Sequence, residues 1–365
     1  MKKVLLIIGT RPEAVKMAPV RLALEKRPEI KAEICVTAQH RQMLDQVLDC
    51  FAVTPDYDLN IMKQAQTLID VTTAALRGVG AVIEKARPDL VLVHGDTSTA
   101  LAAALAAFYR QVPLGHVEAG LRTRDKYSPF PEEMNRQLVD RLSDLLFAPT
   151  ETSRSNLLAE GIAAEKIFVT GNTVIDALST TVRKAYSHPE LERIGSGERL
   201  ILLTAHRREN LGEPLRRIFR AVKRLAEDLP SLRVIYPVHL NPLVRSAAEE
   251  VLAGCERVRL IEPLNVLDFH NFMARADLIL TDSGGVQEEA PSLGKPVLVL
   301  RDTTERPEGI RAGTLKLVGT DEEKIYREAM RLLTDPEEYA GMSRAVNPYG
   351  DGRASERIAD VIASL

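Results

Sequence analysis

Short apolar runs, each followed by a stretch of helical periodicity, recur along the chain and restrict what it can fold into. In the first half they are VLLII (4–8), EICVT (33–37), LVLVH (90–94), PLGHV (113–117), DLLFA (144–148) and KIFVT (166–170). Helical stretches such as APVRLALEK and TALAAALAAFYR lie between them. Apolar strands that alternate with helices are typical of a parallel sheet covered on both faces. The pattern therefore predicts a doubly wound α/β domain.

The same alternation restarts after a polar connector at residues 186–198. The second set of runs is LILLT (200–204), RVIYP (233–237), VRLIE (258–262), LILTD (278–282), PVLVL (296–300) and LKLVG (315–319). We expect an α/β fold of two Rossmann-like domains, at residues 1–170 and 171–350, with a final helix at about 351–365 that could pack on either half. Ligands bind beyond the carboxyl ends of such strands, so two sheet edges that face across a cleft are the expected site.

The composition argues against several classes of protein. The chain has 365 residues, 45% of them hydrophobic and 27% charged, which is enough to bury sizeable cores. A net charge of -3, with Lys and Arg mixed among the acids, argues against a nucleic-acid surface. No run approaches the roughly 20 apolar residues of a membrane span, and MKKVLLIIGTRPE is typical of a buried first strand rather than of a signal peptide. We expect a cytoplasmic protein with a small-molecule partner.

Several common site motifs are missing from the sequence. Cys35, Cys50 and Cys255 lack CxxC spacing and are interpreted as reduced packing residues. Neither HxxxH nor HExxH spacing occurs, so we expect no metal. Without GxGxxG after the first strand, GxxxxGK[ST] or GxSxG, the usual sequence support for hydride transfer, P-loop chemistry and α/β-hydrolases is absent. We expect no cofactor.

The segment TDSGGVQEEA (281–290) has the features of an anion cradle. Ser283, Gly284 and Gly285 are expected to open a helix whose free N–H groups and positive end favour a phosphate. Glu288 and Glu289 are expected in its first turn, where they could accept hydrogen bonds from sugar hydroxyls. An ordinary capped helix is the alternative, but the acid pair and the downstream TTERPE favour a ligand.

Charged residues gather just after other predicted strands. A diphosphate needs cations as well as amide donors. The candidate cations are Arg11, Lys16, Arg207, Arg208 and Arg306. A partly dehydrated carboxylate can act as a general acid or base near neutral pH. The candidate acids are Asp96, Glu118, Glu132 and Glu133. His94 and His116 are interpreted as hydrogen-bonded core residues, whereas His206, among polar residues, is expected to be catalytic or to contact phosphate.

Longer stretches of sequence carry a family resemblance. They are GTRPEAVKMAPV, HGDTSTA, GHVEAGLRT, SPFPEEMNR, LLTAHRREN, TDSGGVQEEAPSLGKPVLVLRDTTERPE and AGTLKLVGT. With these in order from residue 4 to at least 319, the chain resembles the bacterial non-hydrolysing UDP-N-acetylglucosamine 2-epimerases. The resemblance implies the glycosyltransferase-B architecture, an interdomain substrate, a last helix that returns to the N-terminal domain, and a homodimer.

The resemblance also implies roles for particular residues. Ser283, Gly284 and Gly285 would bind the diphosphate of UDP, Glu289 would hold the ribose hydroxyls and Phe269 would lie near the uracil. Diphosphate or sugar contacts are implied for Arg11, Lys16, His206 and Arg306. Catalytic roles are implied for Asp96, Glu118 and Glu132, with His206 beside them. Leu264 stands where relatives have Gln near the base, so a side-chain contact there is not expected.

The implied reaction is the reversible conversion of UDP-GlcNAc to UDP-ManNAc. In the family, UDP is eliminated to give 2-acetamidoglucal and is then added back. Some relatives bind a second substrate molecule as an activator. Positions that match this second site are Gln39, Gln42, Glu133, Arg207 and His239. Because Ala65 stands where regulated members carry Arg, we expect such a site in reduced form.

Two other functions remain open from the sequence. A glycosyltransferase could use the same fold, since fold alone does not determine function. A UDP-sugar sensor could keep the site without chemistry, although the presence of Asp96, Glu118, Glu132 and His206 argues against it. A more heavily modified UDP-amino sugar is an alternative substrate, and surface polysaccharide is the expected use.

Overall fold

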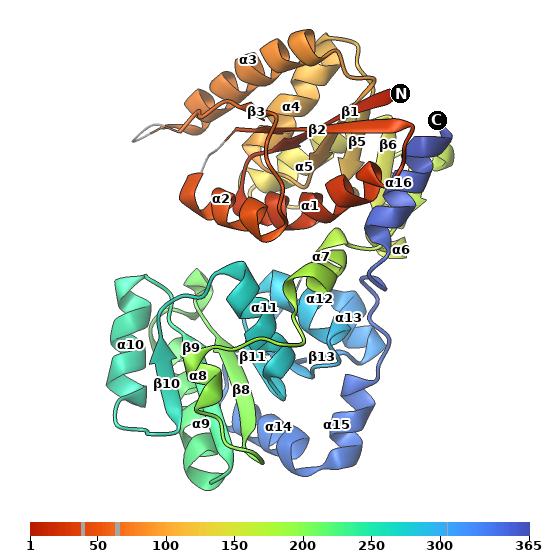
Figure 1. Cartoon of the computed structure of the whole chain (residues 1–365). Helices are drawn as coiled ribbons and strands as arrows, with labels where there is room; N and C mark the ends of the chain where they lie inside the picture. The colour runs from red at the N-terminus through yellow and green to blue at the C-terminus, as the bar shows by residue number, and fades with distance from the viewer. Residues whose placement is uncertain (38–40, 63–65, 305) are drawn as a thin grey trace. The chain divides into compact units, whose positions relative to one another are not determined.

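The computed structural model describes residues 1–37, 41–62, 66–304 and 306–365, and the chain divides into two compact units (Figure 1). Unit 1 comprises Met1–Thr180 and Tyr349–Leu365, and unit 2 comprises Thr181–Pro348. Each unit contains a parallel sheet with alternating helices, so the predicted α/β class with two Rossmann-like domains is confirmed. The expected boundary at residue 170 precedes α7 (Thr173–Thr181), which belongs to unit 1 as far as Thr180.

In the described residues of unit 1 the sheet has seven parallel strands in the order β3-β2-β1-β4-β5-β6-β7. The strands are β1 (Lys2–Ile8), β2 (Ile30–Val36), β3 (Tyr57–Asp58), β4 (Leu90–His94), β5 (Leu114–Val117), β6 (Leu145–Ala148) and β7 (Ile167–Val169). Every apolar run predicted as a strand in this half forms one. Only β3 was not predicted, because a strand of two residues leaves no apolar run.

Helices cover both faces of the unit 1 sheet. They are α1 (Arg11–Glu25), α2 (Arg41–Cys50), α3 (Leu68–Ala86), α4 (Ser98–Tyr109), α5 (Glu132–Leu142), α6 (Glu151–Ala159), α7 and α16 (Ala354–Ser364). The group α3, α4 and α5 lies on one face, and α1, α2 and α16 lie on the other (Figure 1). The last helix is held by Lys2 Nζ, which donates to the Ile362 carbonyl at 2.9 Å, and by Asp176, which accepts from the Ser355 amide at 2.7 Å.

The part of unit 2 that the structure describes has a six-stranded parallel sheet in the order β10-β9-β8-β11-β12-β13. The strands are β8 (Arg199–Thr204), β9 (Leu232–Pro237), β10 (Val258–Ile261), β11 (Leu278–Thr281), β12 (Val297–Val299) and β13 (Leu315–Leu317). The helices are α8 (Pro189–Glu192), α9 (Glu213–Asp228), α10 (Pro242–Leu252), α11 (Val266–Arg275), α12 (Gly284–Ser292), α13 (Pro307–Ala312), α14 (Glu322–Thr334) and α15 (Pro336–Ser343). Its core includes Phe219 and Tyr236, whose ring centroids are 5.4 Å apart.

Each sheet has one point where the strand order reverses. In unit 1 this switch point lies between β1 and β4, and in unit 2 it lies between β8 and β11. Loops at the carboxyl ends of such strand pairs are where ligands of doubly wound sheets bind. Among the helices of the described residues, none is long and apolar enough to span a bilayer.

Candidate active site

The loops at the unit 1 switch point are tied together by Glu13, a residue that the sequence analysis did not single out. Its carboxylate accepts from the amides of Gly9 and Thr10 at 2.7 and 2.5 Å and from Thr97 Oγ1 at 2.6 Å. Burial raises the pKa of Glu13, although the hydrogen bond from Thr97 acts in the opposite direction. The loop after β1, which precedes Arg11, is therefore fixed to the loop after β4, which contains Asp96.

Glu118 follows β5 and lies in a buried polar cluster of unit 1. Lys16 Nζ donates to Glu118 Oε2, and Asn172 Nδ2 donates to the same oxygen at 3.1 Å. His94 Nε2 lies 3.3 Å from Oε2 as well. Burial alone would raise the pKa of Glu118, but the Lys16 ammonium and His94 hold it well below its usual range. Glu118 is thus a carboxylate at neutral pH, with its neighbours gathered at one oxygen.

The two histidines predicted to be core residues differ. His116 is fully buried and fully engaged, with Nδ1 2.6 Å from Asp140 Oδ1 and Nε2 2.9 Å from the Gly95 carbonyl oxygen, as expected. His94 is buried too, but its ring nitrogens have no hydrogen-bond partner among the described groups. Its contact with Glu118 makes it part of the charged cluster rather than of a satisfied core.

Arg136 links two of the predicted acids. Its Nη2 donates to Asp96 Oδ2 at 2.5 Å, and its Nη1 lies 3.3 Å from Glu133 Oε2. Glu133 is fully buried, and it also accepts from the amides of Thr123 and Arg124 at 3.0 and 3.1 Å. Burial alone would raise the pKa of Glu133, but these hydrogen bonds lower it. Glu133 holds the loop after β5, whereas Glu132, the first residue of α5, is only partly buried.

In unit 2 the loop after β8 is attached to the loop after β11 by Asp282. Asp282 Oδ2 accepts from the amides of His206 and Arg207, both at 2.8 Å. The His206 ring stacks on that of His239, with centroids 5.1 Å apart and planes 4° from parallel. Burial lowers the pKa of the His206 imidazole, and His239 acts in the same direction, whereas Asp282 opposes both. Asp282 was not among the predicted site residues.

Helix α12 begins at Gly284, with Ser283 as its N-cap. The Ser283 side chain makes no capping hydrogen bond. The prediction that Glu288 and Glu289 lie in the first turn was wrong, because a helix that starts at Gly284 has both acids beyond its first turn. The glycine-rich opening itself is placed as expected for an anion cradle.

Glu288 also differs from its expected role as an acceptor for sugar hydroxyls. Its side chain is buried, and Oε1 accepts from Arg306 Nε at 2.8 Å. Thr304 Oγ1 donates to Gln287 Oε1 at 2.7 Å, which ties the segment before Arg306 to α12. Glu288 therefore orients the cation rather than presenting a free carboxylate.

Glu289 is positioned by the neighbouring helix α11. Its Oε2 lies 3.4 Å from Nε2 of His270, a buried residue whose Nδ1 is 2.7 Å from Thr181 Oγ1. Phe269, on the same helix, is partly buried, and Leu264 precedes the N-cap Asn265. Glu289 and Phe269 are thus carried by adjacent helices of unit 2.

Part of the expected second site lies outside the described residues. This holds for Gln39, for Ala65 and for the side chain of Gln42. Of the other matching positions, Glu133 is in unit 1, and Arg207 and His239 are in unit 2. Among the described residues, no group of three or more His, Cys, Asp or Glu could hold a metal ion.

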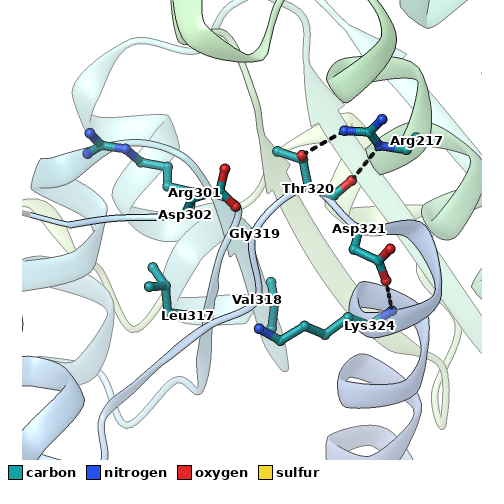
Figure 2. Close-up of a pocket in the computed structure, with 9 residues that line it drawn as sticks. All are labelled: Arg217, Arg301, Asp302, Leu317, Val318, Gly319, Thr320, Asp321 and Lys324. Atoms are coloured by element: carbon teal, nitrogen blue, oxygen red, sulfur yellow. Dashed lines mark hydrogen bonds between the residues drawn. The ribbon is translucent and has the colours of Figure 1, made fainter.

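A hollow of about 420 Å³ in unit 2 lies near the ends of β12 and β13 (Figure 2). Arg217 reaches across from α9 to Thr320, donating to its carbonyl at 3.1 Å, while Lys324 comes from α14 (Figure 2). None of the residues that line this hollow was predicted as a site residue. The predicted residues Lys16, Glu118 and His206 lie elsewhere, in segments that follow β1, β5 and β8.

Known proteins are similar to this chain over nearly all of its length. The family model described as UDP-N-acetylglucosamine 2-epimerase matches residues 22–363. A curated protein of that name from Bacillus subtilis (strain 168) is 63% identical over 358 residues, which cover 98% of this chain and 94% of that protein. Its namesake from Escherichia coli (strain K12) is 53% identical over 368 residues, 99% of this chain and 98% of that protein.

A solved structure extends the likeness to three dimensions. The UDP-GlcNAc 2-epimerase from Neisseria meningitidis, bound to UDP-GlcNAc, is 50% identical to this chain. It matches with a TM-score of 0.90, and the match covers 100% of both chains. The chain therefore belongs to the UDP-N-acetylglucosamine 2-epimerase family.

Proposed function

We propose that this protein interconverts UDP-GlcNAc and UDP-ManNAc by eliminating UDP and adding it back. The observation that carries the proposal is that each unit presents a different set of charged groups after its strands. One presents an ionised and largely buried carboxylate, Glu118, beside Lys16. The other presents a glycine-rich helix start at Ser283 and the anchored cation Arg306. The names of the full-length relatives support the same reaction.

The chemistry explains why both kinds of group are needed. H2 of the sugar is not next to a carbonyl, so removing it as a proton without another change would be prohibitive. A base takes H2, the C2–H electron pair forms a C1=C2 double bond, and the C1–O bond breaks with its electrons leaving on UDP. The product is 2-acetamidoglucal. UDP then bonds to C1 again while a proton reaches the opposite face of C2.

The acids of unit 1 are assigned to the protons. Asp96 follows β4, Glu118 follows β5, and Glu132 begins α5, the next helix along the chain. Glu118 is already deprotonated, and its neighbours are concentrated at Oε2. A positioned acid or base of this kind typically contributes about 10²- to 10⁴-fold to the rate.

The groups of unit 2 are assigned to the nucleotide. Amides at the start of α12, with Ser283, Gly284 and Gly285, would bind the diphosphate together with Arg306 and His206. Glu289 would accept from the ribose hydroxyls, and Phe269 would lie by the uracil. As the C1–O bond breaks, negative charge grows on the leaving phosphate. Removing one preorganised donor at such a position typically costs about 10²- to 10³-fold.

Incubation with UDP-GlcNAc in D2O, followed by proton NMR at C2, tests the proposal. We expect UDP-ManNAc with deuterium at C2, and deuterium in the recovered UDP-GlcNAc. Sugar transfer that requires an added acceptor would instead identify a glycosyltransferase. Binding without turnover would identify a sensor. Turnover of a more heavily modified UDP-amino sugar, but not of UDP-GlcNAc, would reassign the substrate.

We also propose a cytoplasmic homodimer that supplies mannosaminyl units for surface polysaccharide. Cys35 and Cys255 are free thiols, which fits a reducing compartment. The dimer rests on the family resemblance, and analytical ultracentrifugation at micromolar protein would test it. A sedimentation coefficient that corresponds to the monomer at all concentrations would contradict it.

The second nucleotide site is proposed in reduced form. The support is five matching positions, among them Glu133, Arg207 and His239, against the mismatch at Ala65. Initial rates should then depend weakly sigmoidally on UDP-GlcNAc, and traces of UDP-GlcNAc should accelerate the reverse reaction. Strictly hyperbolic rates with no such acceleration would remove the site from the account.

A further inference from the structure

The two carboxylate oxygens of Asp282 have different surroundings. The residue has no exposed surface and stands between β11 and α12. Oδ2 accepts three hydrogen bonds, from the amides of His206 and Arg207 at 2.8 Å and from Asn210 Nδ2 at 3.0 Å. This one oxygen is therefore enough to hold the backbone of the loop after β8.

The other oxygen, Oδ1, is buried and has no hydrogen-bond partner among the described groups. It lies 3.5 Å from His206 Nδ1. A buried carboxylate oxygen without a partner is costly, and such groups in native proteins call for an explanation. A small rotation of the His206 ring would bring Nδ1 from 3.5 Å to hydrogen-bond distance of Oδ1. Such contacts are often long before a ligand binds.

We propose that Asp282 is the positioning residue for His206, holding its proton on Nδ1 and turning Nε2 toward the leaving phosphate. This rests on the phosphate-contacting role proposed for His206. An ionised carboxylate can only accept, so it selects the tautomer that carries hydrogen on Nδ1. When the ring takes a second proton, Nε2–H becomes a charged donor, which binds an anion about twice as strongly as a neutral one.

The other charged and titratable groups around His206 oppose protonation of its ring, and Asp282 favours it. Within the described part of unit 2, the ring faces His239 from the loop between β9 and α10, Arg207 from its own loop, and Asp282 from the end of β11. His239 and Arg207 disfavour a positive charge on the His206 ring, as does burial of the ring. Asp282 is the group that opposes them.

The Asp282→Asn variant separates the positioning role from the scaffold role. The amide oxygen of Asn can still accept the three hydrogen bonds that reach Oδ2. Its NH2 group then faces His206 Nδ1 and can only donate. The neutral ring should therefore move its proton to Nε2 and become harder to protonate.

Nitrogen-15 NMR of the histidine rings measures the tautomer directly in the ligand-free protein, with the His206 signal assigned through His206→Asn. In the wild type we expect the neutral ring to carry hydrogen on Nδ1. In Asp282→Asn we expect hydrogen on Nε2, a lower pH for ring protonation, and a kcat lower by about 10²-fold or more. A wild-type ring with hydrogen on Nε2 would overturn the proposal even if the variant failed to fold.

Asn210→Ala is the matched control, because it removes the hydrogen bonds to Oδ2 and to the Leu300 carbonyl and leaves Oδ1 and the ring untouched. It should lower the melting temperature while preserving the wild-type tautomer. If Asn210→Ala reproduced the tautomer change, the effect would belong to loop disorder and the proposal would be wrong. Because the NMR needs no substrate, a protein that failed to turn over UDP-GlcNAc would sink the proposed function and leave this test intact.

Discussion

The segments after β1, β4 and β5 in unit 1 and those after β8, β11 and β12 in unit 2 follow strands of two parallel sheets, yet their charged groups are arranged differently. In unit 1 a cation and two polar side chains gather around the carboxylate of Glu118. In unit 2 the buried carboxylates act as hydrogen-bond acceptors for other site residues. Glu288 accepts from the Arg306 side chain, and Asp282 accepts from the backbone of the His206 loop. Equivalent edges of the same kind of sheet thus carry different arrangements of charge.

The difference lies in which charge is left available. Glu118 is held ionised by its neighbours, which fits the acid–base role proposed for it. Arg306 and the helix start at Gly284 offer positive potential, with the nearby acids used for orientation. We therefore expect changes in unit 1 to act on kcat and changes in unit 2 to act on nucleotide affinity.

The strongest effect is expected for Glu118→Gln. Removing the acid–base function should lower kcat by about 10²- to 10⁴-fold, while UDP affinity stays within about threefold of the wild type. Steady-state kinetics and calorimetry with UDP measure the two quantities. Glu151→Gln, the same change at an exposed position of unit 1, should alter neither. A Glu118→Gln enzyme with more than a tenth of the wild-type kcat would break the assignment.

Glu288→Gln tests the opposite arrangement in unit 2. Without the carboxylate of Glu288, Arg306 loses an ion pair that orients it, so UDP should bind about tenfold more weakly. Because Arg306 is partly exposed, we expect a stability loss nearer to about 2 kcal/mol than to the roughly 3–5 kcal/mol of a fully buried pair. Urea unfolding and UDP titration check this, with exposed Glu256→Gln as the control. An unchanged UDP affinity would show that Glu288 does not position the cation.

Glu118 and Glu13 of unit 1 should give opposite pH dependences. The pKa of Glu118 is lowered by Lys16, so its stabilising contribution is present above the unfolded pKa of about 4.3 and is lost as the pH falls through the folded pKa. The pKa of Glu13 is raised by burial, so its contribution is present below that value and is lost as the pH rises through the folded pKa.

Urea unfolding of wild type, Glu118→Gln and Glu13→Gln between pH 4 and 8 measures both slopes. The deficit of Glu118→Gln should be about 1–3 kcal/mol at pH 7 and shrink toward pH 4. Relative to wild type, Glu13→Gln should gain stability as the pH rises. Slopes of the same sign in the two variants would contradict the electrostatic description of this cluster.

A smaller effect is expected where unit 2 contacts the ribose. His270→Gln removes the ring that meets Glu289, and loss of one net hydrogen bond of about 1 kcal/mol corresponds to about fivefold weaker UDP binding. The preference for UDP over 2′-deoxy-UDP should fall with it. His188→Gln is the matched control, since His188 packs against Phe272 on the same helix. Full retention of the preference would show that His270 does not act through Glu289.

The smallest effect is expected at the surface of unit 1. A side-chain hydrogen bond from Arg357 lowers the pKa of Asp351 to about 2. Both side chains are largely exposed, so Asp351→Asn should cost no more than about 1 kcal/mol at pH 7. That contribution is present above about pH 4 and is lost as the pH falls toward 2. A loss of several kcal/mol on urea unfolding would show that this pair anchors α16.

The sequence was sufficient for elements that leave a local pattern. The predicted strands from VLLII to LKLVG all form, because a strand buried on both faces must be apolar along its length. Ser283, Gly284 and the start of α12 were found for the same reason, since a strand followed by Ser-Gly-Gly is a local signal.

Buried polar partners were missed because they depend on contacts far apart in sequence. Asp282 meets His206 across a separation of 76 residues, and Glu13 meets Thr97 across 84. The position of Asp282 at the end of an apolar run was a signal that could have found it. The contact between Glu288 and Arg306 was not predicted, because Arg306 lies in the segment after β12 and not on the helix that carries Glu288.

Positional isotope exchange tests the central claim most directly, namely that one unit removes the proton while the other holds a phosphate that departs and returns. The substrate is UDP-GlcNAc with oxygen-18 between C1 and the β-phosphorus, and phosphorus-31 NMR follows the label. We predict that the label moves into non-bridging positions of the β-phosphate, because the freed phosphate can rotate before it bonds to C1 again. UDP-ManNAc that forms with all of its label still in the bridge would contradict the account.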